Sequence, residues 1–356
     1  MAQYDFSRLS VLVVEDSKFM QSLILGVLRA LGVERITLCE NGEEAIRVLK
    51  PTNVAGKSAI GNSGIDLVFC DMFMPVVDGA MFLRWVRRSE KSPDRFLPII
   101  MISAAADAGV LFGTRDAGVD EFLAKPFSAT TILNRIKSVI ENPRPYIYCP
   151  TYFGPDRRRK HRVPEVERRV ILDDEIEILH SGKDVASLKN SKKRVWIFKL
   201  QKQLKTKLTT GFSNDNSLAF DDSMVSAIEE KISEMEGDYA DWVSESIREM
   251  NKAHKGMIDD LSASDQYMAT INRVALELRG QGGIFGYPLI TQFGKSLYET
   301  TMPGTEPGEK LLELIDAHFD LIKVVMSQKI KGDGGTIGRE LLNNLTKAKK
   351  KFSGVS

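Results

Sequence analysis

Five residues in the amino-terminal third of the chain have the side chains needed to bind and transfer a phosphoryl group. They are Glu15, Asp16, Asp71, Ser103 and Lys125. Clustered carboxylates repel one another unless a cation neutralises them, and Mg²⁺ prefers such hard oxygen ligands. One carboxylate of the group can then act as a nucleophile, while the metal and a lysine offset the charge of the phosphoryl group and a serine donates a hydrogen bond. This chemistry requires that the fold bring the five residues together.

Residues 1–141 alternate short apolar runs with amphipathic stretches, and the five residues stand where apolar runs end. The predicted strands are 9–14, 35–39, 65–70, 97–103 and 120–124, and the predicted helices are 17–31, 41–50, 78–90, 106–117 and 128–140. Strands rich in Val, Ile and Leu that alternate with helices indicate a parallel sheet covered on both faces. Five such units predict a doubly wound α/β domain with a five-stranded parallel sheet, whose ligand site lies at the carboxyl ends of the strands.

Four stretches of this region resemble the receiver domain of bacterial two-component response regulators, which has a flavodoxin-like fold. They are "VVED" (13–16), "DMFMPVVDG" (71–79), "IIMIS" (99–103) and "FLAKPF" (122–127). The resemblance covers residues 8–141. It implies that Asp71 accepts a phosphoryl group from a phosphohistidine of a histidine kinase or a phosphotransfer protein.

The same resemblance implies a role for each residue of the site. Asp16, Asp71 and the backbone carbonyl of Phe73 would bind Mg²⁺, and Glu15 would reach the metal through water. Ser103 and Phe122 would form the switch pair, and Lys125 would bind the phosphate next to a cis bond to Pro126. Phe73 departs from the polar residue often found at its position. Because an apolar ring cannot orient a hydrolytic water, we expect a long-lived phosphorylated state.

Residues 142–212, here called the linker region, open with several prolines and the basic run "DRRRKHR" (156–162). We predict a basic connector that contains a strand and a short amphipathic helix. The run could contact nucleic-acid phosphates, fold against the acidic helix at 221–254, or remain solvated. A DNA-binding response regulator acting through residues 157–207 is therefore the alternative interpretation. Since no recognition-helix motif is present, we do not expect nucleic acid to bind.

Residues 213–352 are helical in pattern throughout, and they predict an all-α helix bundle. The expected helices are 221–254, 264–285, 287–301, 308–331 and 337–352. In and just before the stretch "RVALELRGQGGIFGYPL" (273–289), the residues Ile271, Val274 and Leu278 mark a buried helix face. Leu276 is about 200° around the helix from Leu278, so it points away from that face.

This stretch resembles the active helix of histidine phosphotransfer domains, where an exposed histidine is followed three and four residues later by a basic residue and a glycine. Arg279 and Gly280 hold those two places, and Leu276 holds the place of the histidine. The resemblance implies a docking face for another receiver or a kinase, formed by Leu276, Arg279, Gly280 and Gly283, that transfers no phosphate. In the other interpretation, the glycines only allow tight helix packing. His318, beside an apolar stripe, is expected to be a packing residue.

The composition limits the class of protein further. The 356 residues carry a net charge of +1, with 43% hydrophobic and 27% charged residues, as in soluble globular proteins. Three widely spaced cysteines indicate neither a disulfide framework nor a zinc site. No apolar run approaches 18 residues and no leader pattern is present, so we expect a cytoplasmic protein without a membrane partner. We expect a signalling protein and not a turnover enzyme.

Overall fold

The computed structural model describes most of the chain and divides into two compact units. The described residues are 3–50, 64–104, 117–157, 176–179, 195–199, 203–210, 222–260 and 263–353. The first unit comprises residues 1–123 with 129–229, and the second comprises 124–128 with 230–356. Most of the predicted helix at 106–117 and most of the basic run lie outside the described residues, as do His161 and His180.

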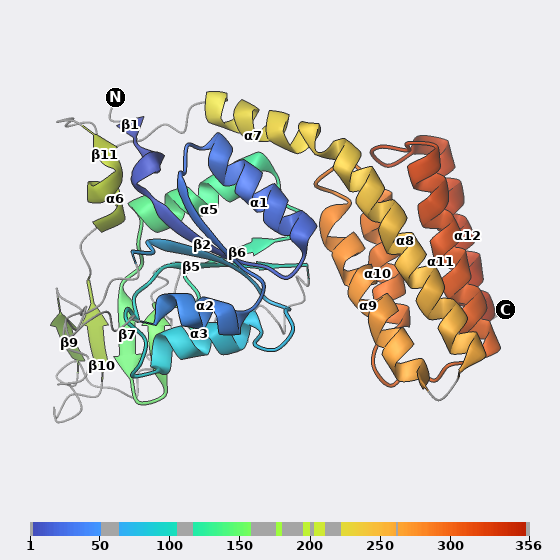
Figure 1. Cartoon of the computed structure of the whole chain (residues 1–356), viewed down its shortest axis with the longest axis horizontal. Coiled ribbons are helices and arrows are strands. Elements are labelled where there is room, and N and C mark those ends of the chain that lie inside the picture. Colours follow the sequence, from blue (N-terminus) through green and yellow to red (C-terminus); the bar gives the residue numbers. More distant parts are fainter. Residues whose placement is uncertain are drawn as a thin grey trace, which may run out of the picture. The chain divides into compact units, whose positions relative to one another are not determined.

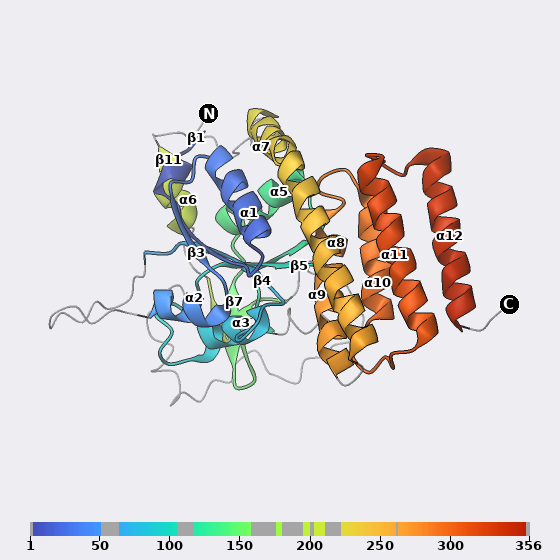
Figure 2. The same ribbon diagram turned by 45° about the vertical axis from the view of Figure 1, so that its right-hand side comes forward.

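The first unit contains the predicted five-stranded sheet, which confirms the fold class. Its strands are β2 (Ser10–Val14), β3 (Arg35–Cys39), β4 (Leu67–Asp71), β5 (Ile99–Ser103) and β6 (Glu121–Ala124), in the order β3-β2-β4-β5-β6. The pairs β2–β3, β2–β4 and β4–β5 are parallel. The covering helices are α1 (Lys18–Ala30), α2 (Gly42–Leu49), α3 (Gly79–Arg88) and α5 (Ala129–Glu141). Helices α1 and α5 lie on one face of the sheet, and α2 and α3 lie on the other (Figures 1 and 2).

Burial and capping explain why these segments adopt their structures. Every residue of β4 and β5 is buried, as expected of strands covered on both faces. Three helices begin at a side chain that accepts a hydrogen bond from the backbone: Ser17 from Met20 at α1, Asn41 from Glu44 at α2, and Asp78 from Met81 at α3. These caps fix the loops at the carboxyl edge of the sheet, where the site lies.

The linker region has more structure than the single strand and helix predicted for it. Strands β7 (Tyr146–Cys149), β8 (Tyr152–Pro155), β9 (Ile176–Leu179) and β10 (Val195–Phe198) form a second sheet in the order β8-β7-β10-β9. Its core consists of Tyr146, Phe153, Trp196 and Phe198, and Phe96, in the segment before β5, packs against it. The Phe96 ring lies 5.1 Å from that of Tyr146 and 5.3 Å from that of Phe198, measured between centroids. An aromatic core therefore attaches the small sheet to residues 1–141, here called the receiver-like part.

The end of the linker region returns to the beginning of the chain. After helix α6 (Gln203–Leu208), strand β11 (Thr209–Thr210) pairs with β1 (Gln3–Tyr4), next to the short 3₁₀ helix η1 (Phe6–Arg8). The Lys207 ammonium lies 2.6 Å from the carboxylate of Asp66, which also accepts the backbone N–H of Ser10 at 2.8 Å. The end of the linker region thus contacts the segment that precedes β4 and, through Asp66, the start of β2.

The second unit is mainly helical, in agreement with the predicted bundle. Its helices are α8 (Glu236–Asp259), α9 (Ser264–Gln281), α10 (Pro288–Thr300), α11 (Glu309–Ser327) and α12 (Gly335–Ser353), and α7 (Asp222–Glu234) precedes them in the chain. Helices α8 and α10 each pack against both α9 and α11, so these four form the bundle. Helix α12 packs on the outside of α11 (Figures 1 and 2). Within the described residues, no helix is both long and apolar enough to cross a bilayer.

His318 lies in the core of this bundle and is fully buried. Its Nδ1 is 2.7 Å from the carbonyl oxygen of Leu314, and its Nε2 is 2.9 Å from the hydroxyl of Ser296. Because a carbonyl oxygen only accepts, Nδ1 carries the proton and Nε2 accepts from the serine. Burial lowers the pKa of His318 to about 4. The ring is therefore a neutral packing group, as its place beside an apolar stripe predicted.

We predict that His318 makes the bundle less stable in mild acid. In the unfolded chain a histidine takes up its proton near pH 6.5, whereas folded His318 does so near pH 4. The unfolded state then binds more protons between these values, so the stability falls as the pH falls through this window. A shift of this size corresponds to a loss of about 2 kcal/mol at pH 5.

Urea unfolding of the helical signal at pH 7.5, 6, 5 and 4.5 measures this loss. The His318→Gln variant, which cannot titrate, should show a flatter dependence of its free energy of unfolding on pH. An unchanged pH dependence in the variant would contradict the assignment.

Candidate functional site

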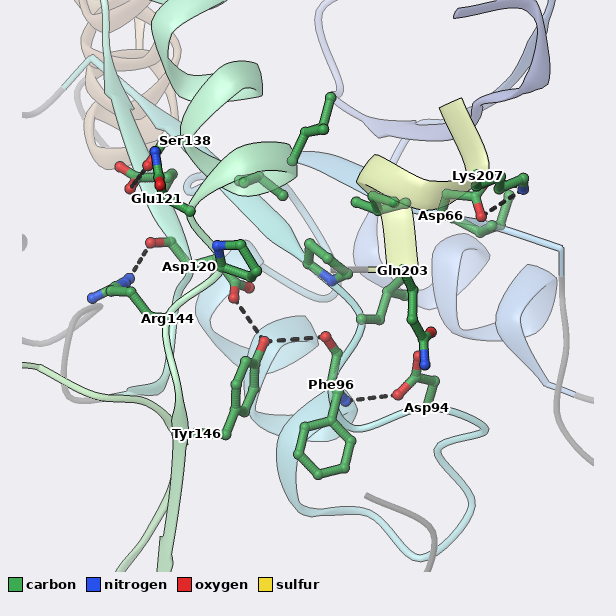
Figure 3. A pocket seen from close by; sticks show the side chains of 18 residues that line it. Asp66, Asp94, Phe96, Asp120, Glu121, Ser138, Arg144, Tyr146, Gln203 and Lys207 are labelled. Atoms are coloured by element: carbon green, nitrogen blue, oxygen red, sulfur yellow. Dashed lines mark hydrogen bonds and ion pairs between the residues drawn. The ribbon is translucent and has the colours of Figure 1, made fainter. Parts of the chain in front are cut away.

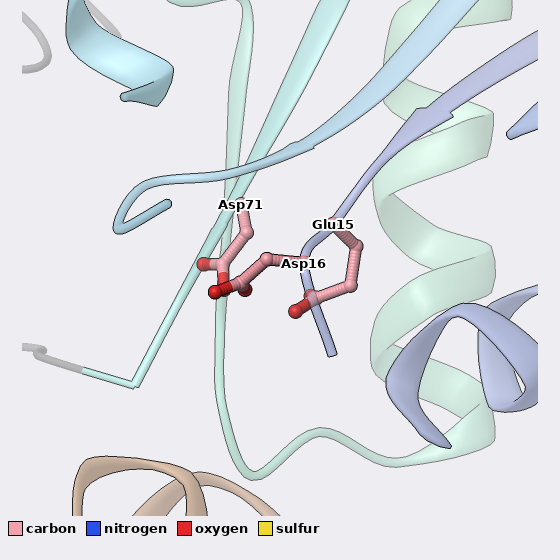
Figure 4. A group of neighbouring side chains, drawn as sticks. All are labelled: Glu15, Asp16 and Asp71. Carbon is pink, nitrogen blue, oxygen red and sulfur yellow. The ribbon is translucent and has the colours of Figure 1, made fainter. Parts of the chain in front are cut away.

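Three carboxylates meet at the carboxyl edge of the five-stranded sheet. Glu15 and Asp16 directly follow β2, and Asp71 is the last residue of β4. Each residue offers one carboxylate oxygen, and these three oxygens lie within 4.8 Å of one another (Figure 4). Glu15 and Asp71 are buried, and Asp16 is partly accessible. The structure thus brings together the three acids that the sequence predicted to converge.

Strand register and a buried glutamine hold this cluster in place. Val14 of β2 stands opposite Cys70 of β4, so Glu15 and Asp71 occupy the next positions on neighbouring strands. The side-chain amide of Gln21 donates to the backbone carbonyls of both Glu15, at 2.6 Å, and Cys39, at 3.1 Å. Gln21 is buried and ties the end of β2 to the end of β3. The sequence analysis did not identify this residue, although a polar side chain on the buried face of α1 was a usable signal.

The backbone around Asp71 leaves little space. The N–H of Met72 donates to Asp71 Oδ1 at 2.7 Å, and the N–H of Gly79 donates to the carbonyl of Met72 at 3.0 Å. A Cβ atom at Gly79 would lie 2.2 Å from the carbonyl oxygen of Asp71. The glycine of the "DMFMPVVDG" stretch is therefore required by the close approach of α3 to the end of β4.

Ser103 is the last residue of β5 and Lys125 directly follows β6, whereas Phe122 lies within β6. Asp71 pairs with Ile102 across the β4–β5 ladder, so Ser103 is one position beyond it and is fully buried. Lys125 directly follows β6, is buried, and precedes Pro126 through a cis peptide bond. Phe122 is half-buried and packs against the core cluster of this sheet. The roles of these residues remain predictions that rest on the resemblance.

The loop after Asp71 contains an exposed and strained apolar segment. The Phe73 side chain is 41% exposed, and Val76 is 73% exposed with φ of +68°. A β-branched residue rarely adopts this left-handed conformation, which stores strain. A hydrogen bond at the following residue holds the turn in place: the backbone carbonyl of Val77 accepts the N–H of Gly42 at 2.9 Å. A Cβ atom at Gly42 would lie 2.8 Å from that carbonyl oxygen, so a glycine at this place allows the contact.

The donor set of the cluster fits Mg²⁺. Three carboxylates offer hard oxygen atoms, which this cation prefers over nitrogen and sulfur ligands. Their mutual repulsion at this separation is relieved by a divalent cation. Burial and the nearby carboxylates of Asp71 and Glu15 raise the pKa of the Cys70 thiol well above its usual value, so this cysteine stays protonated. Among the described residues, Glu15, Asp16 and Asp71 form the cluster of potential ligand side chains that lie close enough together to hold a metal ion.

The predicted docking face on α9 is only partly open. Leu276 is half-buried, whereas Arg279 and Gly280 are buried. The Arg279 guanidinium lies 5.8 Å from the centroid of the Tyr298 ring on α10. A cation–π contact of this kind stabilises the arginine side chain, and the docking role of Arg279 stays a prediction.

Two of the four glycines in residues 273–289 serve the backbone of the bundle. A Cβ atom at Gly282 would lie 2.7 Å from the carbonyl oxygen of Tyr287 and 2.8 Å from the amide nitrogen of Thr291, and Gly286 has φ of +81°. Gly294 makes a third close approach, since its Cβ would lie 2.6 Å from the amide nitrogen of Arg279. The packing interpretation therefore accounts for Gly282, and Gly286 satisfies a turn. The docking role of Gly280 and Gly283 stays a prediction.

Comparison with known proteins identifies relatives of the first unit. The family of response regulator receiver domains matches residues 11–137. The chemotaxis protein CheY of Bacillus subtilis is 30% identical over 130 residues, which cover 36% of this chain and 96% of that protein. CheY of Pseudomonas aeruginosa is 28% identical over 133 residues, or 37% and 97% of the two chains. The solved receiver domain of a Pseudomonas aeruginosa sensor histidine kinase, with coordinated magnesium, shares 32% identity over 36% of this chain and 94% of its own, with a TM-score of 0.30.

We predict that Gly79→Ala disturbs the acidic edge of the sheet. Its new methyl group would overlap the backbone of Asp71, which should cost roughly 1–3 kcal/mol. Hydrogen exchange of residues 67–79, followed by mass spectrometry, should increase. Gly237→Ala is the matched control, because no heavy atom lies within 4 Å of its Cβ position. Equal exchange in wild type and Gly79→Ala would show that the loop accommodates a side chain.

Proposed function

The chain belongs to the response regulator receiver family through its residues 11–137, and from this premise we propose that it is a phosphorylation-dependent signalling protein of a two-component system. Asp71 accepts a phosphoryl group from a histidine kinase or a phosphotransfer protein. The phosphorylated state then acts through protein–protein contacts of the helical bundle. The observation that carries the proposal is the convergence of Glu15, Asp16 and Asp71 at the carboxyl edge of the sheet.

In the transfer step, a carboxylate oxygen of Asp71 forms a bond to the phosphorus of a phosphohistidine. The N–P bond breaks, and its electron pair leaves with the imidazole of the donor, so the product is an acyl phosphate. Asp16, Asp71 and the backbone carbonyl of Phe73 would hold Mg²⁺, with Glu15 reaching it through water, and the cation would offset the charge of the phosphoryl oxygens. The Ser103 hydroxyl and the Lys125 ammonium donate hydrogen bonds to the same oxygens. Phe122 completes the switch with Ser103.

The chain then acts as a signalling component and not as a turnover enzyme. The covalent product stays on Asp71 and changes the surface of the domain, and this change is the output. The exposed ring of Phe73 offers no polar group for holding a hydrolytic water. This feature supports a long lifetime for the phosphorylated state.

The bundle receives no phosphate in this proposal. Of its two histidines, His318 is fully buried, and His254 is 5% exposed with Nε2 3.2 Å from the carbonyl oxygen of Leu312. Leu276 stands where a phosphotransfer domain would present its reactive histidine. These features support a bundle that docks another receiver or a kinase without phosphoryl transfer.

The DNA-binding alternative gains no support from the described part of the linker region. The helix among its described residues, α6, has only six residues, which is too short for a recognition helix. Two of its cations make intramolecular contacts: Lys207 pairs with Asp66, and Arg144 donates to the backbone carbonyls of Val119 and Asp120. We therefore propose output through protein contacts.

We predict that Asp71 is the stable phosphoryl acceptor and that its phosphorylation needs Mg²⁺. Incubation with acetyl phosphate should add one phosphoryl group, detected by intact mass, in wild type and in the control variant Asp241→Asn, which lies in the bundle. Asp71→Asn removes the nucleophile and should remain unlabelled. EDTA should also abolish labelling, because the carboxylates then repel the incoming anion. Label that persists in Asp71→Asn or in EDTA would refute the assignment.

We predict that Leu276→Asp weakens docking at the α9 face. Burying a whole leucine contributes roughly 1.5–3 kcal/mol, and the partial exposure of Leu276 leaves part of this for a partner, so binding should fall about tenfold. Affinity for partners captured with the wild-type chain measures the effect. Ile258→Asp is the matched control, since Ile258 is an exposed apolar residue of α8.

Two outcomes would contradict this prediction. Unfolding of Leu276→Asp would show that the leucine belongs to the core. A folded variant that keeps full affinity for each partner would show that the face is not a docking surface.

A further inference from the structure

A cavity of about 460 Å³ lies in the first unit at the end of the sheet opposite to Asp71 (Figure 3). The receiver-like part contributes the segments before β4, β5 and β6 and the end of α5. The linker region contributes residues 142–146 and α6. This volume is that of a small-molecule site, and such sites often lie where two parts of a protein meet.

The cavity combines an apolar surface with a set of acidic groups. Its apolar lining includes Ile65, Leu97, Pro98, Val139, Ile140 and Leu204. Four carboxylates also line it, from Asp66, Asp94, Asp120 and Glu121. The side chains of Lys207 and Arg144 are the cations among its lining residues. An occupant would therefore meet hydrocarbon over much of its surface and a predominantly negative set of charges.

Three of the four carboxylates are already neutralised by the protein. Asp66 pairs with Lys207 through both oxygens, at 2.7 and 2.6 Å. Asp120 pairs at 2.6 Å with Arg87, a fully buried guanidinium, and accepts the Tyr146 hydroxyl at 2.7 Å. Glu121 pairs with Arg135 and accepts the hydroxyl of Ser138. Of the two lining cations, Lys207 is paired with Asp66, and the Arg144 guanidinium donates to the backbone carbonyl oxygens of Val119, Asp120 and Asp156.

Asp94 differs from the other three. Its carboxylate accepts the backbone N–H of Phe96 at 2.8 Å, and no cation among the described residues forms an ion pair with it. The surrounding protein raises the pKa of this carboxyl, and the Phe96 N–H and the more distant Arg87 offset the effect only in part. Asp94 remains accessible to solvent, so a ligand can reach it. A cation placed here would pair with a carboxylate that has no cationic partner among the described residues.

We propose that this cavity binds a small organic cation, an amine or guanidinium carried on an apolar body. The cationic group pairs with Asp94, and the body packs against Leu97, Ile140 and Leu204. The exposed side chains of Asn142 and Gln203 lie in the same lining and offer amide oxygens to further N–H groups of the ligand.

The site is separate from the phosphoryl site and does not depend on the proposed function. It joins two parts of the chain, because Asp94 and Leu97 precede β5 whereas Leu204 belongs to α6. A ligand here binds the receiver-like part and the linker region together, so it stabilises the arrangement in which the two are packed.

Three probes with one apolar body test the proposal on the full chain: 4-phenylbutylamine, 4-phenylbutanol and 4-phenylbutyrate. Isothermal titration calorimetry at pH 7.5 should give a dissociation constant for the amine at least about tenfold lower than for the alcohol, because a charge-assisted hydrogen bond adds this much. The acid should bind most weakly. Hydrogen exchange should slow at residues 94–98 and 138–146 when the amine binds.

The Asp94→Asn variant should lose the preference for the amine over the alcohol while keeping its fold, since an asparagine oxygen still accepts the Phe96 N–H. Glu34→Gln, which removes an exposed carboxylate outside the cavity, should keep the preference. Leu204→Trp should weaken all three probes by filling the cavity, and this variant decides the case if Asp94→Asn is unfolded. Equal binding of amine and alcohol, no saturable binding of any probe, or a preference that survives in Asp94→Asn would overturn the proposal.

Discussion

The parallel pairing of β2 with β4 is the contact on which the chemistry of this chain depends. It places Glu15 and Asp71 on adjacent strand ends, where water is largely excluded and their charges act at short range. The rest of the domain holds this unfavourable arrangement in place: Gln21 ties the strand ends together, and Gly79 lets α3 approach Asp71. The stability of the scaffold thus offsets the repulsion that a cation site requires.

The five-stranded sheet and its acidic edge could be predicted from the sequence because both depend on short-range patterns. Apolar runs of strand length alternate with helical stretches, and parallel strands bring their ends to one edge. The linker region could not be predicted in the same way. Its sheet depends on Tyr146, Trp196 and Phe198, which are far apart in sequence and share a core with Phe96. No local periodicity reports such a long-range aromatic contact.

The α9 segment shows the other limit of sequence reasoning. A glycine on a helix predicts close approach, but the sequence does not say whether a partner or a neighbouring helix makes that approach. At Gly282 the neighbour is α10 of the same bundle. The contact of Arg279 with Tyr298 likewise joins residues 19 positions apart in the chain. Spacing predicted the helix, and tertiary packing determined these contacts.

The return of β11 to β1 shows that the compact first unit extends beyond the family match. The family match ends at residue 137, yet the cation for Asp66 comes from Lys207, and Phe96 finds its aromatic neighbours in β7, β8 and β10. A chain cut at residue 137 would lack Lys207 and the aromatic residues that cover Phe96, and β1 would lose its partner strand β11. Evolution can exchange one-domain receivers between proteins as independent modules. In this chain the aromatic side chains that cover Phe96 are encoded up to about 60 residues beyond the match, so a receiver cut out at its family boundaries would leave that ring uncovered.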